Sequence, residues 1–127
     1  MTREALAALL SEAGAAFPDE ACGLLLGRKG RIERAVPARN VHPEPGRHFE
    51  IDPQTLVEAH RAARGGGPEV IGYFHSHPAG PAVPSAADRD AAPGDGRVWA
   101  IVGGCEVRFW RDGDEGFAAL STRAVSR

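Results

Sequence analysis

Two histidines separated by one residue, His75 and His77, carry the clearest chemical signal in the sequence. They follow an apolar run at residues 69–74 that is typical of a buried strand. Side chains alternate along an extended backbone, so both imidazoles project to one side, ~6.6 Å apart at the backbone, while Ser76 faces the opposite way. Zinc accepts neutral imidazole nitrogens as ligands. The spacing therefore predicts two ligands of one zinc site.

Asp88 is the best candidate for a third ligand. It stands three residues after Ser85, and this S-x-x-D pattern predicts a helix that begins at Ser85. A carboxylate in the first turn of that helix points back toward the histidines, whereas Asp90 faces elsewhere. The simpler alternative is that Ser85 and Asp88 form only a helix cap. With Asp88 included, the set has the three protein ligands of a catalytic zinc site, which leaves a fourth position for water.

Other metal sites find less support in the sequence. His42, His48 and His60 lack such neighbours and are expected to be structural or surface groups. Cys22 and Cys105 form no C-x-x-C pair, are expected in buried strands and are predicted not to bind metal. There is also no H-E-x-x-H motif and no H-x-E with P-C-x-x-C, as zinc deaminases require.

The elements that must position these groups follow from apolar periodicity and from glycine and proline breakers. Helices are expected at residues 4–16, from Asp52-Pro53 to residue 65, and from Ser85 onward. Strands are expected at residues 21–27, 31–36, 48–51, 69–74, 97–102, 106–110 and 117–120, with turns at residues 29–30 and 103–104. This order predicts an α/β fold, a mixed sheet with helices packed on it, in a single domain over residues 1–127.

Composition argues against several classes of partner. The formal net charge is −2 and the isoelectric point about 6.2, so no cationic field exists to hold nucleic acid or an anionic membrane. No stretch approaches the ~18 apolar residues of a spanning helix, and the first residues do not resemble a secretory leader. We therefore expect a cytoplasmic protein with reduced thiols. The sequence does not indicate an oligomeric state.

The candidate residues, with one further glutamate, resemble the complete motif of the JAMM (MPN+, prokaryotic JAB) zinc metalloproteases. The motif is filled by Glu20, by the H-S-H-P run at residues 75–78 and, six residues later, by the S-x-x-D pair at residues 85–88. Residues 20–27 are similar to the family's first strand, and residues 39–53 are similar to a segment of its compact bacterial members.

This resemblance implies a fold and a cofactor. The implied fold is the cytidine-deaminase-like (JAB1/MPN) arrangement, a mixed sheet flanked by helices. The implied cofactor is one Zn²⁺, with His75, His77 and Asp88 as its ligands. The implied activity is that of a zinc metallopeptidase or isopeptidase.

The resemblance also assigns roles to two residues. Glu20 corresponds to the family's catalytic acid/base, which would take a proton from water and return it to the leaving amine. Spacing alone does not single out Glu20, because Glu50, Glu58 and Glu69 are equally available. Ser85 matches the motif serine, whose hydroxyl could donate to the tetrahedral oxyanion while it also caps its helix.

The compact bacterial relatives implied by the motif act on ubiquitin-like sulfur carrier proteins and cut after a Gly-Gly tail. We expect a partner of that class, whose extended tail suits a narrow site. Two alternatives stay open. An isopeptidase that removes ubiquitin-like proteins from their targets shares the chemistry and differs in the leaving amine. A non-catalytic module would bind a ubiquitin-like partner and keep zinc for structure.

Overall fold

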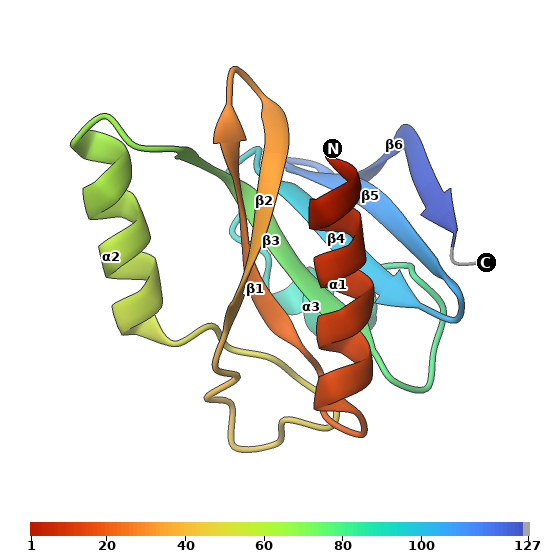
Figure 1. Cartoon of the computed structure of the whole chain (residues 1–127). Helices are drawn as coiled ribbons and strands as arrows, with labels where there is room; N and C mark the ends of the chain where they lie inside the picture. Colours follow the sequence, from red (N-terminus) through yellow and green to blue (C-terminus); the bar gives the residue numbers. More distant parts are fainter. Residues whose placement is uncertain (126–127) are drawn as a thin grey trace.

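In a computed structural model, the backbone is described for residues 1–125 and the side chains for residues 1–120. The helices are α1 (Arg3–Ala16), α2 (Pro53–Arg64) and α3 (Ala86–Ala91). The strands are β1 (Cys22–Arg28), β2 (Arg31–Ala38), β3 (Glu69–His77), β4 (Val98–Gly103), β5 (Glu106–Gly113) and β6 (Gly116–Val125). They form one sheet in the order β2-β1-β3-β4-β5-β6 (Figure 1). The predicted α/β class, a mixed sheet flanked by helices, is confirmed.

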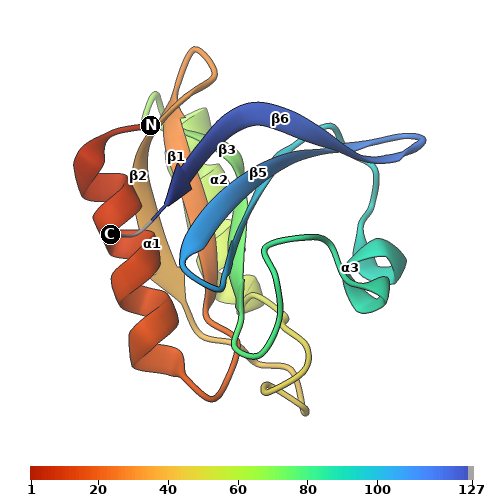
Figure 2. The ribbon, with the colours of Figure 1, turned by 90° about the vertical axis from the view of Figure 1, so that its right-hand side faces the viewer.

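The sheet separates α1 from the other two helices (Figure 2). Alternation along the strands sends Leu25 and Phe74 to the face that α1 covers, where they pack with Leu9 in the main core. The neighbours Leu24 and Tyr73 belong to the core on the opposite face, beneath α2. Both faces of the central strands are therefore buried, which explains why these strands read as continuous apolar runs.

Local signals place the start of one helix and the turn of one hairpin where the sequence predicts them. Asp52 caps α2 by accepting a hydrogen bond from the backbone N–H of Gln54, and Pro53 occupies the first turn. The hairpin between β1 and β2 turns at Lys29 and Gly30, whose φ angles of 53° and 74° are those of a two-residue turn.

β3 is longer than the sequence predicts. The expected strand ended at residue 74, with the histidines in a following loop, but β3 continues through His77. The extension pairs with two neighbours, since His75 lies opposite Cys22 of the antiparallel β1 and opposite Ile101 of the parallel β4. The histidines therefore belong to the centre of the sheet.

The strand expected at residues 48–51 is wrong. Only Ile51 makes a β-bridge, to Asn40, and residues 41–50 are irregular. The reason is that the Asn40 side chain bonds the backbone of His48 and Glu50, and so replaces a neighbouring strand.

The expectation that both cysteines lie in buried strands holds for Cys22 only. Cys105 is exposed in the two-residue turn that joins β4 to β5. Gly104, with a φ of 59°, is the first residue of that turn, whereas Gly103 still belongs to β4. The apolar run was thus broken by a turn one residue later than predicted. No helix within the described residues is long and apolar enough to cross a membrane.

Candidate metal centre

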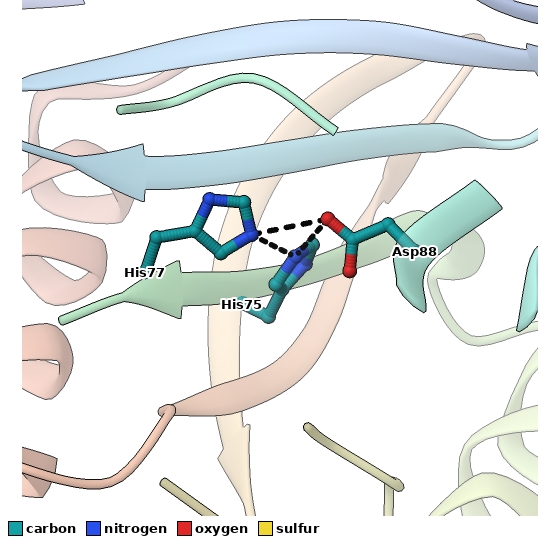
Figure 3. Close-up of side chains that lie close together, drawn as sticks. All are labelled: His75, His77 and Asp88. Carbon is teal, nitrogen blue, oxygen red and sulfur yellow. Dashed lines mark hydrogen bonds and ion pairs between the residues drawn. The ribbon is translucent and has the colours of Figure 1, made fainter. Parts of the chain in front are cut away.

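The histidine pair projects from one face of β3. His75 and His77 are two residues apart, and the strand's alternation turns both imidazoles toward α3 (Figure 3). His75 is fully buried, whereas the side chain of His77 is 11% exposed. The outer histidine therefore faces the solvent side of the cluster.

Asp88 reaches the histidines from the first turn of α3. Ser85 Oγ accepts a hydrogen bond from the backbone N–H of Asp88 at 3.1 Å, and the Ser85 N–H donates to Oδ2 of Asp88 at 3.0 Å. This is the capping box that the sequence predicts. The same Oδ2 atom lies 3.0 Å from Nε2 of His75 and 3.0 Å from Nε2 of His77. Cap and metal ligand are therefore compatible roles for one carboxylate.

The three ligand atoms form a nearly equilateral triangle. Its sides are the two distances of 3.0 Å and a separation of 3.1 Å between the two Nε2 atoms. Two ligands bound ~2.0 Å from a tetrahedral zinc ion lie ~3.3 Å apart, close to these values. Within the described residues, this is the one group of His, Cys, Asp or Glu side chains placed to hold a metal ion. The residues present fit zinc.

Hydrogen bonding leaves a lone pair available at the outer histidine. Nδ1 of His77 lies 2.8 Å from the carbonyl oxygen of Pro81, to which it must donate its proton. In the neutral imidazole, Nε2 then carries the lone pair that faces Asp88. This is the tautomer that a metal ion requires.

Electrostatics at the cluster favour positive charge at its centre. Burial lowers the pKa of His75, although the hydrogen bond that the protonated ring donates to Asp88 opposes this shift. Burial also acts to lower the pKa of His77, but its bonds to Asp88 and to the Pro81 carbonyl raise it overall. Burial would raise the pKa of Asp88, yet the two histidines hold it well below its usual range. A proton or a divalent cation can supply the charge that the Asp88 carboxylate attracts.

The position of the Pro81 carbonyl, which orients His77, depends on the absence of a side chain at Gly103. Residues 80–82 cross the end of β4 so closely that a Cβ on Gly103 would lie 2.6 Å from the backbone atoms of both Pro81 and Ala82. Only glycine permits this approach. Trp110 Nε1 donates to the Ala82 carbonyl at 3.2 Å and secures the crossing from β5.

Aromatic rings enclose the inner histidine. Phe49 stacks on His75, with ring centroids 4.3 Å apart, and Trp99 meets the same imidazole edge-on at 5.6 Å. Nδ1 of His75 is buried, and no hydrogen-bond partner for it lies in the described part of the chain. The ring is therefore oriented by packing on this side.

Glu20 lies two residues before β1 begins at Cys22. It is buried, and no hydrogen-bond partner for its Oε1 atom lies within the described residues. Burial raises the pKa of Glu20 to about 7; the charge of His77 opposes this rise and that of Asp88 adds to it. A carboxyl group with this pKa, near two candidate ligands, can accept and return a proton at neutral pH.

Ser76 faces the opposite side of β3, as predicted. Its Oγ accepts a hydrogen bond from the backbone N–H of Ala21 at 2.8 Å, and its own N–H donates to the Ala21 carbonyl at 3.0 Å. Ser76 therefore ties the histidine strand to the residue next to Glu20.

Comparison with known proteins identifies the family. A family model described as prokaryotic homologues of the JAB domain matches residues 2–113. The chain belongs to the prokaryotic JAB family.

Named relatives agree with this assignment. The JAB chain is 38% identical to a desampylase of Haloferax volcanii over 86 residues, which are 66% of this chain and 62% of that protein. It is 41% identical to a probable TtuB-protein conjugate cleaving protease of Thermus thermophilus over 88 residues, 69% of this chain and 56% of that protein. The match thus spans less than two thirds of either relative. A solution structure of protein DSY2949 from Desulfitobacterium hafniense, 31% identical, superposes with a TM-score of 0.80 over 94% of this chain and 87% of that one.

Several other residues of the JAB chain lie apart from the cluster, and two residues that contact its surroundings were not singled out by the sequence. His42 and His48 stack on each other at 4.7 Å, apart from the metal centre. Neither cysteine belongs to the described ligand group. The sequence did not single out Phe49 or Asn40, since their contacts with the site depend on the irregular loop. The alternation of apolar and polar residues around Phe49 predicted that its side chain is buried, but it did not indicate that the ring packs on His75.

Proposed function

We propose that the chain is a zinc-dependent peptidase that hydrolyses the bond after the Gly-Gly tail of a ubiquitin-like or sulfur carrier protein. The observation that carries this proposal is the triangle of Nε2, Nε2 and Oδ2 atoms together with the buried carboxyl group of Glu20. The charges of His77 and Asp88 act on that carboxyl group, and its Oε1 atom has no hydrogen-bond partner within the described residues. The relatives' names support the substrate class, because they include a TtuB-conjugate protease and a CysO-cysteine peptidase of Mycobacterium tuberculosis.

His75, His77 and Asp88 would hold the ion. When bound there, zinc supplies Lewis acidity, which polarises the scissile carbonyl and lowers the pKa of water. Glu20 takes one proton from the attacking water at its carboxylate and delivers it to the leaving amine as the carbon–nitrogen bond breaks. The exposed Ser85 hydroxyl, whose oxygen accepts from the Asp88 N–H, still has its own hydrogen to donate to the oxyanion.

A cleavage assay with three substrates tests the proposal. A carrier protein ending in Gly-Gly is extended by cysteine, by a short peptide, or through the side-chain amine of a target lysine. We expect stoichiometric zinc and hydrolysis of at least one substrate, which a chelator abolishes. Preference for the lysine-linked substrate would identify the isopeptidase alternative. A zinc-loaded protein that cleaves none of them would overturn the proposal.

Glu20→Gln separates catalysis from binding. The change keeps size and removes the base, so kcat should fall by about 10²- to 10⁴-fold. Glu12→Gln is the matched control, because Glu12 lines the same cavity of about 280 Å³ from α1. If the Glu20 variant keeps the full function of the wild type, the chain is a binding module.

A reducing, cytoplasmic setting belongs to the same proposal. Both cysteines are free thiols, which supports a compartment that keeps them reduced.

A further inference from the structure

Asn40 is the centre of a hydrogen-bond network that joins Glu20 to the loop of residues 41–50. Its Nδ2 atom donates to the carbonyl oxygens of Glu20, Pro45 and His48, at 3.1, 3.4 and 2.9 Å. Its Oδ1 atom accepts from the backbone N–H groups of His42 and Glu50, both at 3.1 Å. One side chain thus organises most of the irregular segment between β2 and α2.

The first group held by this network is the backbone of Glu20. The carbonyl of Glu20 accepts from Asn40, and the N–H of Glu20 donates to the carbonyl of Pro45 at 2.8 Å. Asn40 in turn donates to that same Pro45 carbonyl. Both polar backbone groups of Glu20 are therefore held by the segment that Asn40 organises, since Glu20 itself lies just outside β1.

The second group is the ring that covers the inner histidine. Asn40 binds the carbonyl of His48 and the N–H of Glu50, the two residues on either side of Phe49. Phe49 stacks on His75 at 4.3 Å. The same amide thereby fixes the backbone from which Phe49 reaches the candidate metal ligand.

We propose that Asn40 is a positioning residue for the hydrolysis: it holds the backbone of Glu20 on one side of the centre and that of Phe49 on the other. This inference rests on the proposed function. The position requires an amide, because Nδ2 faces three carbonyl oxygens and Oδ1 faces two N–H groups. An aspartate would meet the carbonyls with an acceptor, and alanine would leave all five groups without this partner.

The test uses Asn40→Ala and Asn40→Asp in the full chain, with Arg39→Ala, at an exposed neighbouring position, as the control. Because Asn40 does not touch the ligand atoms, we expect stoichiometric zinc and a KM within about two-fold of the wild type. We expect kcat to fall by about 10- to 100-fold in both Asn40 variants, and Arg39→Ala to match the wild type. An unchanged kcat, or a rise in KM that accounts for the whole loss, would overturn the proposal.

A double-mutant cycle with Glu20→Gln separates positioning from general stability. If Asn40 acts through Glu20, adding Asn40→Ala to Glu20→Gln should reduce the residual rate by less than about three-fold. A further loss as large as that in the wild-type background would show that Asn40 does not act through Glu20 and would overturn the proposal.

Two remaining outcomes also decide the proposal. If Asn40→Ala does not fold, Asn40→Gln, which keeps the amide one methylene further out, takes its place in the cycle. If neither variant folds, Asn40 is a folding residue and the proposal fails. Cleavage by the wild type with full activity in the Asn40 variants would defeat this inference alone, whereas absence of cleavage in the wild type would defeat the proposed function with it.

Discussion

The ring of Phe49 stacks on the imidazole of His75 with an interplanar angle of 18°. The two residues come from different parts of the fold, an irregular loop and the central strand β3. The stack covers a fully buried ring whose Nδ1 has no hydrogen-bond partner in the described residues. Packing against Phe49 thus orients the imidazole of His75. In many metal-binding histidines a hydrogen bond to a carboxylate or a carbonyl has this role.

Phe49→Ala should weaken both the fold and the metal site. We expect a loss of about 2–4 kcal/mol in the free energy of unfolding, because a partly buried aromatic ring is removed. Zinc affinity should fall by about 10- to 100-fold as His75 loses its orientation. Urea unfolding and competition with a fluorescent chelator measure the two effects. Phe17→Ala is the control: Phe17 is 65% exposed, and its removal should change stability by less than about 0.5 kcal/mol. Equal effects at both positions would contradict the role of the stack.

Asp88→Asn should abolish stable metal binding. The change keeps the shape of the side chain but removes the negative charge shared by both histidines, so zinc affinity should drop by more than about 100-fold. Metal analysis of the purified protein measures the result. Asp90→Asn, on the exposed side of the same helix, should retain full zinc occupancy. Zinc retained in the Asp88 variant would remove Asp88 from the ligand set.

Glu20 should make the metal-free protein less stable as pH rises. Its pKa is raised from 4.5 to about 7, so between these values the folded state binds more protons than the unfolded state. Stability therefore decreases through this window, by at most about 3 kcal/mol and by less if water enters the adjoining cavity. Metal-free Glu20→Gln should match the wild type near pH 4 and exceed its stability at pH 8. Parallel stability curves, measured by urea unfolding, would contradict the raised pKa.

Gly103→Ala should disturb His77 without touching it. The added methyl group meets the backbone of residues 80–82 at 2.6 Å, so the loop must move and the Pro81 carbonyl must leave Nδ1 of His77. We expect about a 10-fold or greater loss of zinc affinity, measured by chelator competition. Gly14→Ala, in α1 with open space around it, should bind zinc normally and gain up to about 1 kcal/mol of stability. Normal zinc binding by the Gly103 variant would show that the loop contact is dispensable.

The two thiols should differ in reactivity, and neither should be needed for metal. Burial, with a smaller contribution from Glu20, raises the pKa of Cys22 to about 12, whereas Cys105 is exposed. A thiol reagent should modify one cysteine in the native protein and two in denaturant. The Cys22→Ala, Cys105→Ala protein should keep its zinc. Loss of zinc there would mean that the ligand set has been misassigned.

The sequence was most informative where a local period determines geometry. Alternation along an extended chain turned His75 and His77 to one side, and the capping box aimed Asp88 back at them; both relationships are present. The identity of the general base could not be derived in this way, because the fold brings Glu20 to the histidines across more than fifty residues. That assignment came from the family resemblance and stays a proposal.

The errors arose where side chains replace backbone pairing or where a turn shifts by one residue. The Asn40 amide satisfied groups that the alternating segment at residues 48–51 offered to a strand. Side-chain hydrogen bonds that replace backbone pairing in this way produce no periodic pattern in the sequence. The turn between β4 and β5 begins at Gly104 rather than Gly103, so it includes Cys105 and exposes its thiol to solvent.

The paired hydrogen bonds between Ser76 and Ala21 fix the register of β3, the strand that carries the two histidines. Inserting one residue ahead of His75 would turn both imidazoles toward α1 and aim a serine at Asp88. Inserting two would restore the facing but carry the rings ~6.6 Å along the strand, beyond the reach of the carboxylate. Transfer of this metal centre to another sheet would therefore require the register of β3 as well as the three ligand side chains.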